Sequence, residues 1–477
     1  MDSPAYPASE SPAPSRPRCA LILVAPDPPP GLSPWHLLEV AGLPHLERLV
    51  LSCWQAGVPQ VYLLAPPGLQ PVVNLSLARL RRRTEGTVEL AHDWTALESQ
   101  PPSSWLVLTA DSVPSPALVA RLARHPVAPG EAVVVCTDDP AWPLDAPPHL
   151  TALTARLEEH GLPGWRAVGL AHLSPEAWEE WHHWRRETQK PRKCQPHLAA
   201  LLEAGLRYLE AKGRLVAVAA EPFSLTYLGR PEDTQVAARR LAAGLSGSPW
   251  GEGWLESSLN RRLARALLPT VATWPVRPTQ ITLLHLALGL LAALLFLEGT
   301  YPSTVAGALL LPLVLVLDSL DGLLARLTFR QTRLGQFLDL YGDTLLNLVI
   351  FLSIAAGLYR VTGQLLYLVL MLPLTTGYGW CWWLTDPHRR RLWPLHSPAL
   401  SPTPVVAEMT SRDFVYLILV FAFLGRLDWF IVGVAAGSHL FAFLLHYFHH
   451  HQKKNIPPPV RQSETPTGSP GEYGPAH

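Results

Sequence analysis

The chain has 477 residues, which is enough for about three domains of ordinary size. Its 38 lysines and arginines balance its 38 aspartates and glutamates, so its charge gives no reason to expect a nucleic-acid partner, and we expect none. The five cysteines have neither metal-site nor disulfide spacing, which predicts packing residues in a reducing compartment. The first apolar run, residues 19–25, is too short and too poorly flanked for a signal peptide, so we expect the amino terminus to stay in the cytoplasm.

The first half of the chain predicts a soluble α/β domain. Residues 1–17 are rich in proline, serine and alanine and are expected to form a disordered tail. In residues 18–245, short apolar runs alternate with amphipathic stretches, which indicates a layered and largely parallel sheet. Strands are expected at residues 20–25, 61–64, 105–109, 132–136 and 215–219. Helices are expected at residues 43–56, 116–124, 174–187 and 196–211.

Three segments of this half carry a resemblance to a known family. Residues 38–46 resemble a "P-V-x-G-x-P-L" element, and Asp111 follows a strand as a metal-binding aspartate would. Residues 230–233, Arg-Pro-Glu-Asp, resemble a "T-P-E-D" turn that leads into a helix. Together the segments resemble the sugar-phosphate nucleotidyltransferases, which implies a Rossmann-like sheet for residues 18–245.

The departures from that family concern its triphosphate site. Active members cradle the triphosphate in a glycine-rich loop, but residues 25–31 here are filled with prolines, which have no N–H to donate. Trp35 and His36 stand where a lysine is expected, and no second metal aspartate is evident around residues 227–229. We therefore expect a degenerate domain with a structural or regulatory role, in which Asp111 is a turn residue.

Residues 246–275 are predicted to join this domain to a membrane. The Ser-Gly-Ser-Pro run at 246–249 marks a linker. Residues 256–265 then form an amphipathic, arginine-rich pattern. This stretch is either a helix on the cytoplasmic membrane surface, where anionic lipid attracts arginine, or a plain linker helix.

Residues 276–452 predict an all-α transmembrane domain, followed by a disordered tail at 453–477. Arginines gather at 326–333 and 389–391, and Lys453 and Lys454 follow the last span. By the positive-inside rule, these connections, both termini and any site beside them face the cytoplasm of a multi-pass cell-membrane protein. Six apolar spans of about the length that a bilayer needs are expected at residues 280–297, 302–325, 335–359, 363–385, 412–426 and 428–448.

Four acids at the ends of two of these spans are the main functional signal. Charged side chains at membrane depth are costly and are therefore functional candidates. Asp318 and Asp321 are three residues apart, and Asp339 and Asp343 are four apart, so each pair lies on one face of a helix. If the two helices run antiparallel, the four carboxylates converge. One or two hard divalent cations would hold such a cluster ionised.

The residues between the acids complete a motif. Gly322, Ala325 and Gly335 leave room for a ligand or a close helix, and Arg326 can hold a phosphate. The whole pattern, D-x2-D-G-x2-A-R-x8-G-x3-D-x3-D over residues 318–343, resembles the signature of the CDP-alcohol phosphatidyltransferases at every fixed position. The resemblance implies a magnesium- or manganese-dependent enzyme, with two ions, in which an acceptor hydroxyl displaces CMP from a CDP-linked alcohol. It also implies contact with membrane lipid and a homodimer formed through the membrane domain.

The same resemblance assigns roles to individual residues. It makes Asp318, Asp321 and Asp339 metal ligands, and it makes Asp343 the general base, although Asp343 is also a candidate ligand. Gly322 and Ala325 would admit the cytidine, as in similar enzymes.

Two further residues are expected to bind substrate. Residues 278–282 resemble the family's "T-P-N-x-x-T" element, with Thr279 in place of asparagine, which makes Thr282 a candidate. The order of the two halves resembles the bifunctional inositol-phosphate cytidylyltransferase/di-inositol-phosphate-phosphate synthases, which makes an inositol phosphate a candidate acceptor. Arg412 could bind that phosphate or could simply anchor the chain at the cytoplasmic surface.

Three alternatives remain open from sequence alone. The soluble half could itself make the CDP-alcohol from CTP, giving a bifunctional enzyme. A transporter or channel could line an ion path with acids, but these acids lie near one membrane face rather than at the midplane. A membrane-anchored nucleotidyltransferase would need the phosphate loop and the lysine that this chain lacks.

Overall fold

The computed structural model describes most of the chain between residues 16 and 454. The described ranges are 16–24, 38–140, 164–188, 198–245, 259–385 and 414–454, apart from positions 67, 84, 92, 99, 101 and 102, and four single positions between 142 and 157 are described as well. The predicted tails, the proline-filled loop at 25–31, Trp35, His36 and Arg412 fall wholly or mostly outside these residues. The chain forms two compact units, one of residues 1–288, 311–343 and 411–413, the other of residues 289–310, 344–410 and 414–477.

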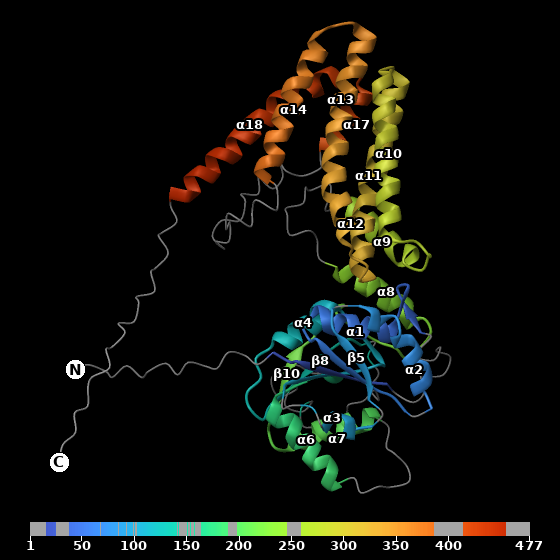
Figure 1. Ribbon diagram of the computed structural model, residues 1–477, viewed down its shortest axis with the longest axis vertical. Coiled ribbons are helices and arrows are strands. Elements are labelled where there is room, and N and C mark those ends of the chain that lie inside the picture. Colours follow the sequence, from blue (N-terminus) through green and yellow to red (C-terminus); the bar gives the residue numbers. More distant parts are fainter. Residues whose placement is uncertain are drawn as a thin grey trace, which may run out of the picture. The chain divides into compact units, whose positions relative to one another are not determined.

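A seven-stranded sheet is the centre of the first unit (Figure 1). Its strand order is β10-β8-β9-β6-β1-β4-β5, and every pairing is parallel except those of β9, which runs antiparallel to both β6 and β8. The prediction of an α/β domain with a largely parallel sheet is therefore confirmed. The strands are β1 (Cys19–Leu23), β4 (Gln60–Leu64), β5 (Thr87–Ala91), β6 (Trp105–Thr109), β8 (Ala132–Thr137), β9 (Arg166–Leu173) and β10 (Leu215–Ala219).

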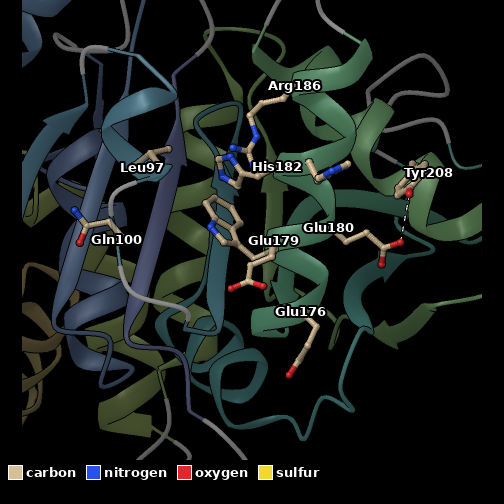
Figure 2. A pocket seen from close by; sticks show the side chains of 10 residues that line it. Leu97, Gln100, Glu176, Glu179, Glu180, His182, Arg186 and Tyr208 are labelled. Carbon is tan, nitrogen blue, oxygen red and sulfur yellow. Dashed lines mark hydrogen bonds between the residues drawn. The ribbon is translucent and has the colours of Figure 1, made fainter.

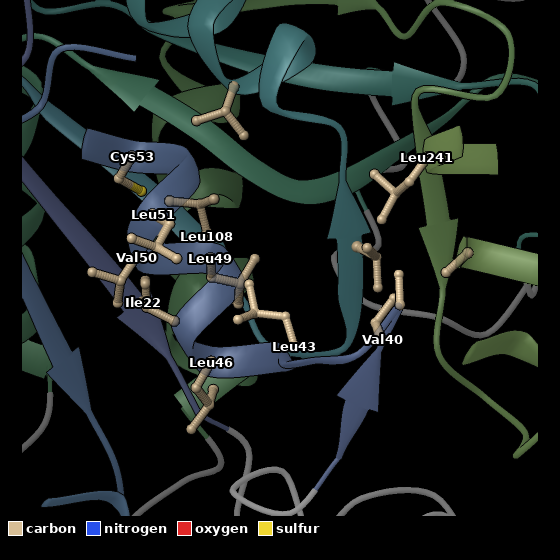
Figure 3. Packing of buried hydrophobic residues seen from close by; sticks show 14 of the residues in the cluster. Ile22, Val40, Leu43, Leu46, Leu49, Val50, Leu51, Cys53, Leu108 and Leu241 are labelled. Carbon is tan, nitrogen blue, oxygen red and sulfur yellow. The ribbon is translucent and has the colours of Figure 1, made fainter. Parts of the chain in front are cut away.

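Both faces of this sheet are covered by helices. Successive side chains of a strand point to opposite faces, so in β1 Ala20 and Ile22 enter one core while Leu21 and Leu23 enter the other. Figure 3 shows the first core, where α1 packs its leucines over Ile22 and Leu108. The first core is covered by α1 (His45–Gln55), α2 (Gln70–Leu77), α4 (Pro116–Arg124) and α8 (Asp233–Gly244). The second is covered by α3 (Thr95–Glu98), α6 (Pro175–Thr188) and α7 (Leu198–Ala211).

Two small antiparallel pairs extend the sheet domain. In the hairpin of β2 (Glu39–Val40) and β3 (Leu43–Pro44), the turn residues Ala41 and Gly42 both have positive φ, as a two-residue hairpin turn requires. A Cβ on Gly42 would lie 1.7 Å from the carbonyl oxygen of Ala272, at the end of α9 (Arg261–Val271). Only glycine allows that approach. The second pair is β7 (Ser112–Pro114) with β11 (Leu225–Tyr227), and a 3₁₀ turn covers Leu80–Arg82.

The predicted elements agree with the structure wherever the local pattern was strong. β6, β10 and α4 have the predicted bounds, and the turn at residues 230–233 leads into α8 as expected. The helix predicted at residues 256–265 overlaps α9, which begins at Arg261; residues 256–258 lie outside the described part. Its location at a membrane surface stays a prediction. The boundaries of the sequence domains stay predictions.

The remaining elements are helical. Among the described residues, four helices are long and apolar enough to cross a membrane: Pro278–Glu298, Tyr301–Leu327, Asp343–Thr362 and Leu427–Leu444. The six predicted spans are therefore not confirmed. α17 has only ten residues, about 15 Å of helix against a hydrocarbon core of about 30 Å, and α14 is not among the four. The helices are α10 (Pro278–Glu298), α11 (Tyr301–Leu327), α12 (Arg333–Phe337), α13 (Asp343–Thr362), α14 (Leu366–Thr385), α17 (Phe414–Phe423) and α18 (Leu427–Lys454).

Small residues pack the helices of the second unit closely. A Cβ on Gly299 would lie 2.3 Å from the carbonyl oxygen of Gly357, and one on Gly377 would lie 2.2 Å from Oγ of Ser438. Close approach through small residues is the usual way in which helices associate in lipid.

Candidate metal and active site

The first pair of acids lies near the carboxyl end of α11. This helix is apolar over most of its length, and Asp318 and Asp321 occupy one face of it, one turn apart. Asp321 is only 3% exposed. The first unit therefore contains carboxylates that are largely removed from solvent.

The second pair lies where the structure departs from a regular helix. The sequence predicts one continuous helix from residue 335, but α12 ends at Phe337 and a π-helical turn, Leu338–Gly342, separates it from α13. Asp339 belongs to this turn and Asp343 is the first residue of α13. π-helical turns are rare and are frequently found at functional sites. The π-helical turn therefore determines the relative position of Asp339 and Asp343 on this part of the chain.

The structure brings the four carboxylates together. One ligand oxygen from each of Asp318, Asp321 and Asp339 lies within 4.8 Å of the other two. A second group consists of His285, Asp318 and Asp343, again with ligand atoms within 4.8 Å of one another. Asp318 belongs to both groups, so the two groups adjoin. The roles of these residues stay predictions, but their convergence is a feature of the fold.

His285 of α10 is a site residue that the sequence analysis missed. Its side chain is 0% exposed, its Nε2 lies 2.8 Å from Oδ1 of Asp343, and its Nδ1 lies 3.4 Å from Oδ2 of Asp321. A signal was available, because an ionisable side chain inside an apolar span is costly and is therefore a functional candidate. The acidic motif at residues 318–343 does not include α10.

Thr282 lies one turn before His285 and contacts an acid. Its Oγ1 donates a hydrogen bond to Oδ2 of Asp321 over 2.6 Å and is also 3.2 Å from the carbonyl oxygen of Pro278. Thr282 was expected to bind substrate. In the structure this buried hydroxyl orients the Asp321 carboxylate.

The small residues of the motif differ in their surroundings. A Cβ added to Gly322 would meet nothing within 4 Å, so space is open beside the acids. At Gly335 a Cβ would lie 3.0 Å from Oγ1 of Thr332, which accepts the backbone N–H of Gly335 as the cap of α12. Arg326 donates from Nε to the carbonyl oxygen of Gly322 over 3.1 Å. Ala325 is half-buried on α11.

The site has the chemistry that a divalent cation requires. Carboxylate oxygens are the preferred ligands of magnesium and manganese, and a cation between like charges packed this closely would keep them ionised. Nδ1 of His285 is buried and lies 3.4 Å from Oδ2 of Asp321. The open space at Gly322 leaves room for a ligand beside this cluster.

The residues that resemble a nucleotidyltransferase site have structural partners. His45 is buried, and its Nε2 bonds the carbonyl oxygen of Ala110 over 2.9 Å. Burial raises the pKa of Asp111, whose own carbonyl accepts the N–H of Leu228. Oδ2 of Asp233 accepts the N–H groups of residues 229 and 230, so it closes the turn before α8. Among the described residues, neither group of candidate metal ligands includes Asp111.

A cavity of about 620 Å³ lies elsewhere in the α/β domain (Figure 2). Figure 2 shows His182, Glu179, Glu180 and Tyr208 around it, on α6 and α7. None of the acids of the helical site and none of the strand-end residues discussed above lines this cavity. It therefore gives no support to a nucleotide site.

The helices and the acids together define a class of protein, a membrane protein with a buried acidic site suited to divalent cations. The family follows from comparison with known proteins. Residues 276–385 match the family model of the CDP-alcohol phosphatidyltransferases. This part of the chain therefore resembles a CDP-alcohol phosphatidyltransferase domain, and it contains the whole of the acidic motif. The family predicted from the motif at residues 318–343 is confirmed.

Curated relatives share only part of their length with this chain. The "Bifunctional IPC transferase and DIPP synthase" of Aquifex aeolicus is 31% identical over 129 residues, which are 27% of this chain and 28% of that protein. The "Inner membrane protein YnbA" of Escherichia coli is 42% identical over 81 residues, 16% of this chain and 39% of that protein. The matched segments thus span well under half of these relatives.

Two solved structures resemble about half of this chain at low identity. The inositol-1-phosphate CTP transferase of T. maritima has a TM-score of 0.37 at 13% identity and covers 49% of this chain and 100% of its own. The 4-diphosphocytidyl-2C-methyl-D-erythritol synthase of Anaerococcus prevotii has a TM-score of 0.32 at 12% identity, with 47% and 97% covered. At these scores the similarity has no bearing on activity.

Proposed function

We propose that the protein is a metal-dependent CDP-alcohol phosphotransferase of the membrane. An acceptor hydroxyl displaces CMP from a CDP-linked alcohol, and the product is a phosphodiester. The observation that carries this proposal is the set of ligand oxygens from Asp318, Asp321 and Asp339 within 4.8 Å of one another, inside the segment that matches the family. The donor is either CDP-diacylglycerol, which yields a phospholipid, or a CDP-polyol, which yields a polyol phosphate.

In this proposal the acids bind two Mg²⁺ or Mn²⁺ ions. Asp318, Asp321 and Asp339 are the ligands, and the hydrogen bond from Thr282 orients Asp321 for that task. When bound, such ions neutralise the pyrophosphate and stabilise the negative charge that develops on the departing CMP. The apolar helices around the acids exclude water and so strengthen these interactions.

Asp343 is the general base of the proposed reaction. It takes the proton of the acceptor hydroxyl as that oxygen bonds to the phosphorus bearing the donor's alcohol. The bond from this phosphorus to the bridging oxygen breaks, and CMP leaves with the electron pair. Asp343 is 7% exposed, and the hydrogen-bond distance of 2.8 Å to His285 restrains its carboxylate. A restrained base with a fixed orientation is what proton abstraction needs.

The substrates are proposed to lie along α11. The open space at Gly322, with Ala325 one turn further on, would admit the cytidine. Arg326 would face a phosphate, which a guanidinium can bind through two hydrogen bonds. Gly335 would keep the start of α12 close to the site. Arg412, outside the described residues, is a candidate for the phosphate of an acceptor such as an inositol phosphate.

The same proposal includes location and assembly. Arg326 lies in the last turn of α11, and Arg330 and Arg333 follow that helix closely. This supports a cytoplasmic site in a multi-pass protein of the cell membrane with both termini inside. The CDP-alcohol would reach such a site from the cytoplasm and the surrounding lipid. A homodimer formed through the membrane domain belongs to the proposal as well.

A second candidate function adds synthesis of the donor. The relative from Aquifex aeolicus is described as bifunctional. The seven-stranded sheet domain of this chain is a possible site for the other activity, forming a CDP-alcohol from CTP. The bonding of His45 and Asp233 to backbone groups supports a structural role instead.

The experiment that tests the proposal is a screen of CDP-alcohol donors and acceptors. The purified full chain is supplied with magnesium or manganese, and CMP release is measured. We expect release with at least one donor, and we expect EDTA, Asp318→Asn and Asp339→Asn each to abolish it. Glu298→Gln is the matched control, an exposed acid at the far end of α10, and it should retain activity. Turnover that persists in EDTA would refute the metal-dependent mechanism.

A further inference from the structure

His285 has no task in the mechanism beyond restraining Asp343. It lies two turns into α10, fully buried, in a helix that is otherwise apolar at this depth. Its Nε2 is 2.8 Å from Oδ1 of Asp343 and 4.0 Å from Oδ1 of Asp318. The imidazole therefore faces the acids from a third helix. A polar ring in this position is costly unless it has a strong interaction.

The distances from Nε2 of His285, 2.8 Å to Asp343 and 4.0 Å to Asp318, are compatible with neighbouring and opposite ligands of one ion. Ligands at about 2.1 Å around an octahedral ion lie about 3 Å from their neighbours. The ligand atoms of His285, Asp318 and Asp343 lie within 4.8 Å of one another, as do those of Asp318, Asp321 and Asp339. Because Asp318 is common to both groups, the arrangement fits two adjacent ions with one shared carboxylate, as two-metal phosphotransfer sites have.

We infer that His285 is itself a metal ligand. Its Nε2, with Asp318 and Asp343, forms a site of mixed nitrogen and oxygen ligands beside the all-oxygen site of Asp318, Asp321 and Asp339. The inference rests on the proposed function in one respect, that the acids bind divalent cations.

The two sites should differ in metal preference. Imidazole suits zinc, iron, nickel and copper, whereas carboxylate oxygens suit magnesium and manganese. The mixed site therefore favours first-row transition-metal ions over magnesium, with manganese the weakest of them, and the all-oxygen site accepts both magnesium and manganese. One carboxylate oxygen of Asp343 then binds the ion beside His285, and the other remains to take the proton of the acceptor hydroxyl.

A half-buried histidine on another helix provides the control. His439 of α18 lies in an apolar helix, but its Nε2 is 3.2 Å from Oγ1 of Thr376 and its Nδ1 is 3.0 Å from the carbonyl oxygen of Ala435. These are ordinary hydrogen bonds of a helix packed against its neighbour. His439→Gln removes an imidazole of the same kind without touching the acids.

The test is pulsed electron paramagnetic resonance of the full-length protein loaded with Mn²⁺. A nitrogen ligand gives a ¹⁴N hyperfine coupling to the bound ion, and growth on ¹⁵N-histidine should convert it to the ¹⁵N pattern. We expect this coupling and two ions per chain in the wild type. His285→Gln should lose the coupling. It should also lower the affinity for one of the two ions by at least about tenfold, the lower end of the loss that follows removal of a metal-orienting partner. His439→Gln should keep the nitrogen coupling and the affinity for both ions.

The outcomes separate this inference from the proposed function. Two bound ions without nitrogen coupling would overturn the inference alone and leave His285 as a hydrogen-bonding neighbour of Asp343. The measurement on the wild type decides this even if His285→Gln fails to fold. A wild type that binds no manganese or magnesium would overturn the metal-dependent function and this inference together.

Discussion

Arg48 of α1 donates a hydrogen bond from Nη1 to the carbonyl oxygen of Leu327, the last residue of α11, over 2.8 Å. Its Nη2 donates to the carbonyl oxygen of Val40, also over 2.8 Å, and its guanidinium lies 5.8 Å from the centre of the Phe329 ring. The last carbonyls of a helix have no partner within it, and a cation is favourable there. An arginine of the sheet domain thus caps the helix that presents Asp318 and Asp321.

Loss of this cap should affect both stability and activity. Arg48→Met should leave two buried carbonyls without their donor, each at a cost of about 1–3 kcal/mol, and should lower both Tm and the rate of CMP release. Arg79→Met is the control, because Arg79 is 80% exposed and only reaches Glu47 at 4.0 Å. Thermal unfolding and the CMP assay measure the two effects. An Arg48→Met variant with wild-type values in both would show that the cap is dispensable.

The next prediction separates the roles of Asp343. Asp343→Asn keeps an amide oxygen that can still ligate a cation but removes the basic group. We expect kcat to fall by roughly 10²–10⁴-fold, as is usual for loss of a general base, with a smaller loss of metal affinity. Single-turnover kinetics and calorimetric metal titration measure the two quantities. If Asp343→Asn loses metal as completely as Asp318→Asn, the residue is chiefly a ligand and another group is the base.

A further prediction concerns the sheet domain. The full chain with Asp318→Asn, in which the transferase is blocked, should release no pyrophosphate from CTP and an alcohol phosphate. The reason is that Asp111 belongs to neither group of candidate metal ligands among the described residues, and residues 25–31 have few N–H groups for a triphosphate. Pyrophosphate release that disappears on adding Asp111→Ala would establish the bifunctional alternative instead.

The last prediction concerns acid sensitivity. Burial lowers the pKa of His45, His172 and His182 to about 4 each, below the value of about 6.5 in an unfolded chain. The unfolded state therefore takes up more protons as the pH falls. Stability should be complete above pH 6.5 and decline towards pH 4, by up to about 1.4 kcal/mol per pH unit for each histidine.

Tryptophan fluorescence during unfolding can follow this loss, because several tryptophans lie in the second core of the sheet domain. His172→Gln removes one of the three groups and should make stability depend less steeply on pH. His183→Gln is the control, since the His183 side chain is 66% exposed and should leave the slope unchanged. If stability fell equally steeply with pH in the wild type, His172→Gln and His183→Gln, His172 would not be one of the groups that cause the acid sensitivity.

The sequence was informative where the signal is local. The bounds of β6, β10 and α4 follow from runs of a few residues, since alternation and helical periodicity act over short distances. The proximity of Asp318 and Asp321 could also be predicted from sequence, because both residues lie on one helix and are three positions apart. β9 was missed because nothing in its own residues shows that it inserts antiparallel between β6 and β8.

By itself, the sequence determined the class of the domains, because alternating short elements and long apolar spans are local patterns. It also determined the acidic motif and the family resemblance, which residue type and spacing within the 26 positions 318–343 carry. Only the tertiary structure decided how the motif is completed. It brought His285 and Thr282 of α10 to the acids, and it placed Arg48 at the end of α11. It also put a π-helical turn where a regular helix was expected. These contacts join residues 39 to 279 positions apart, and such pairings arise from packing the whole chain rather than from any local preference.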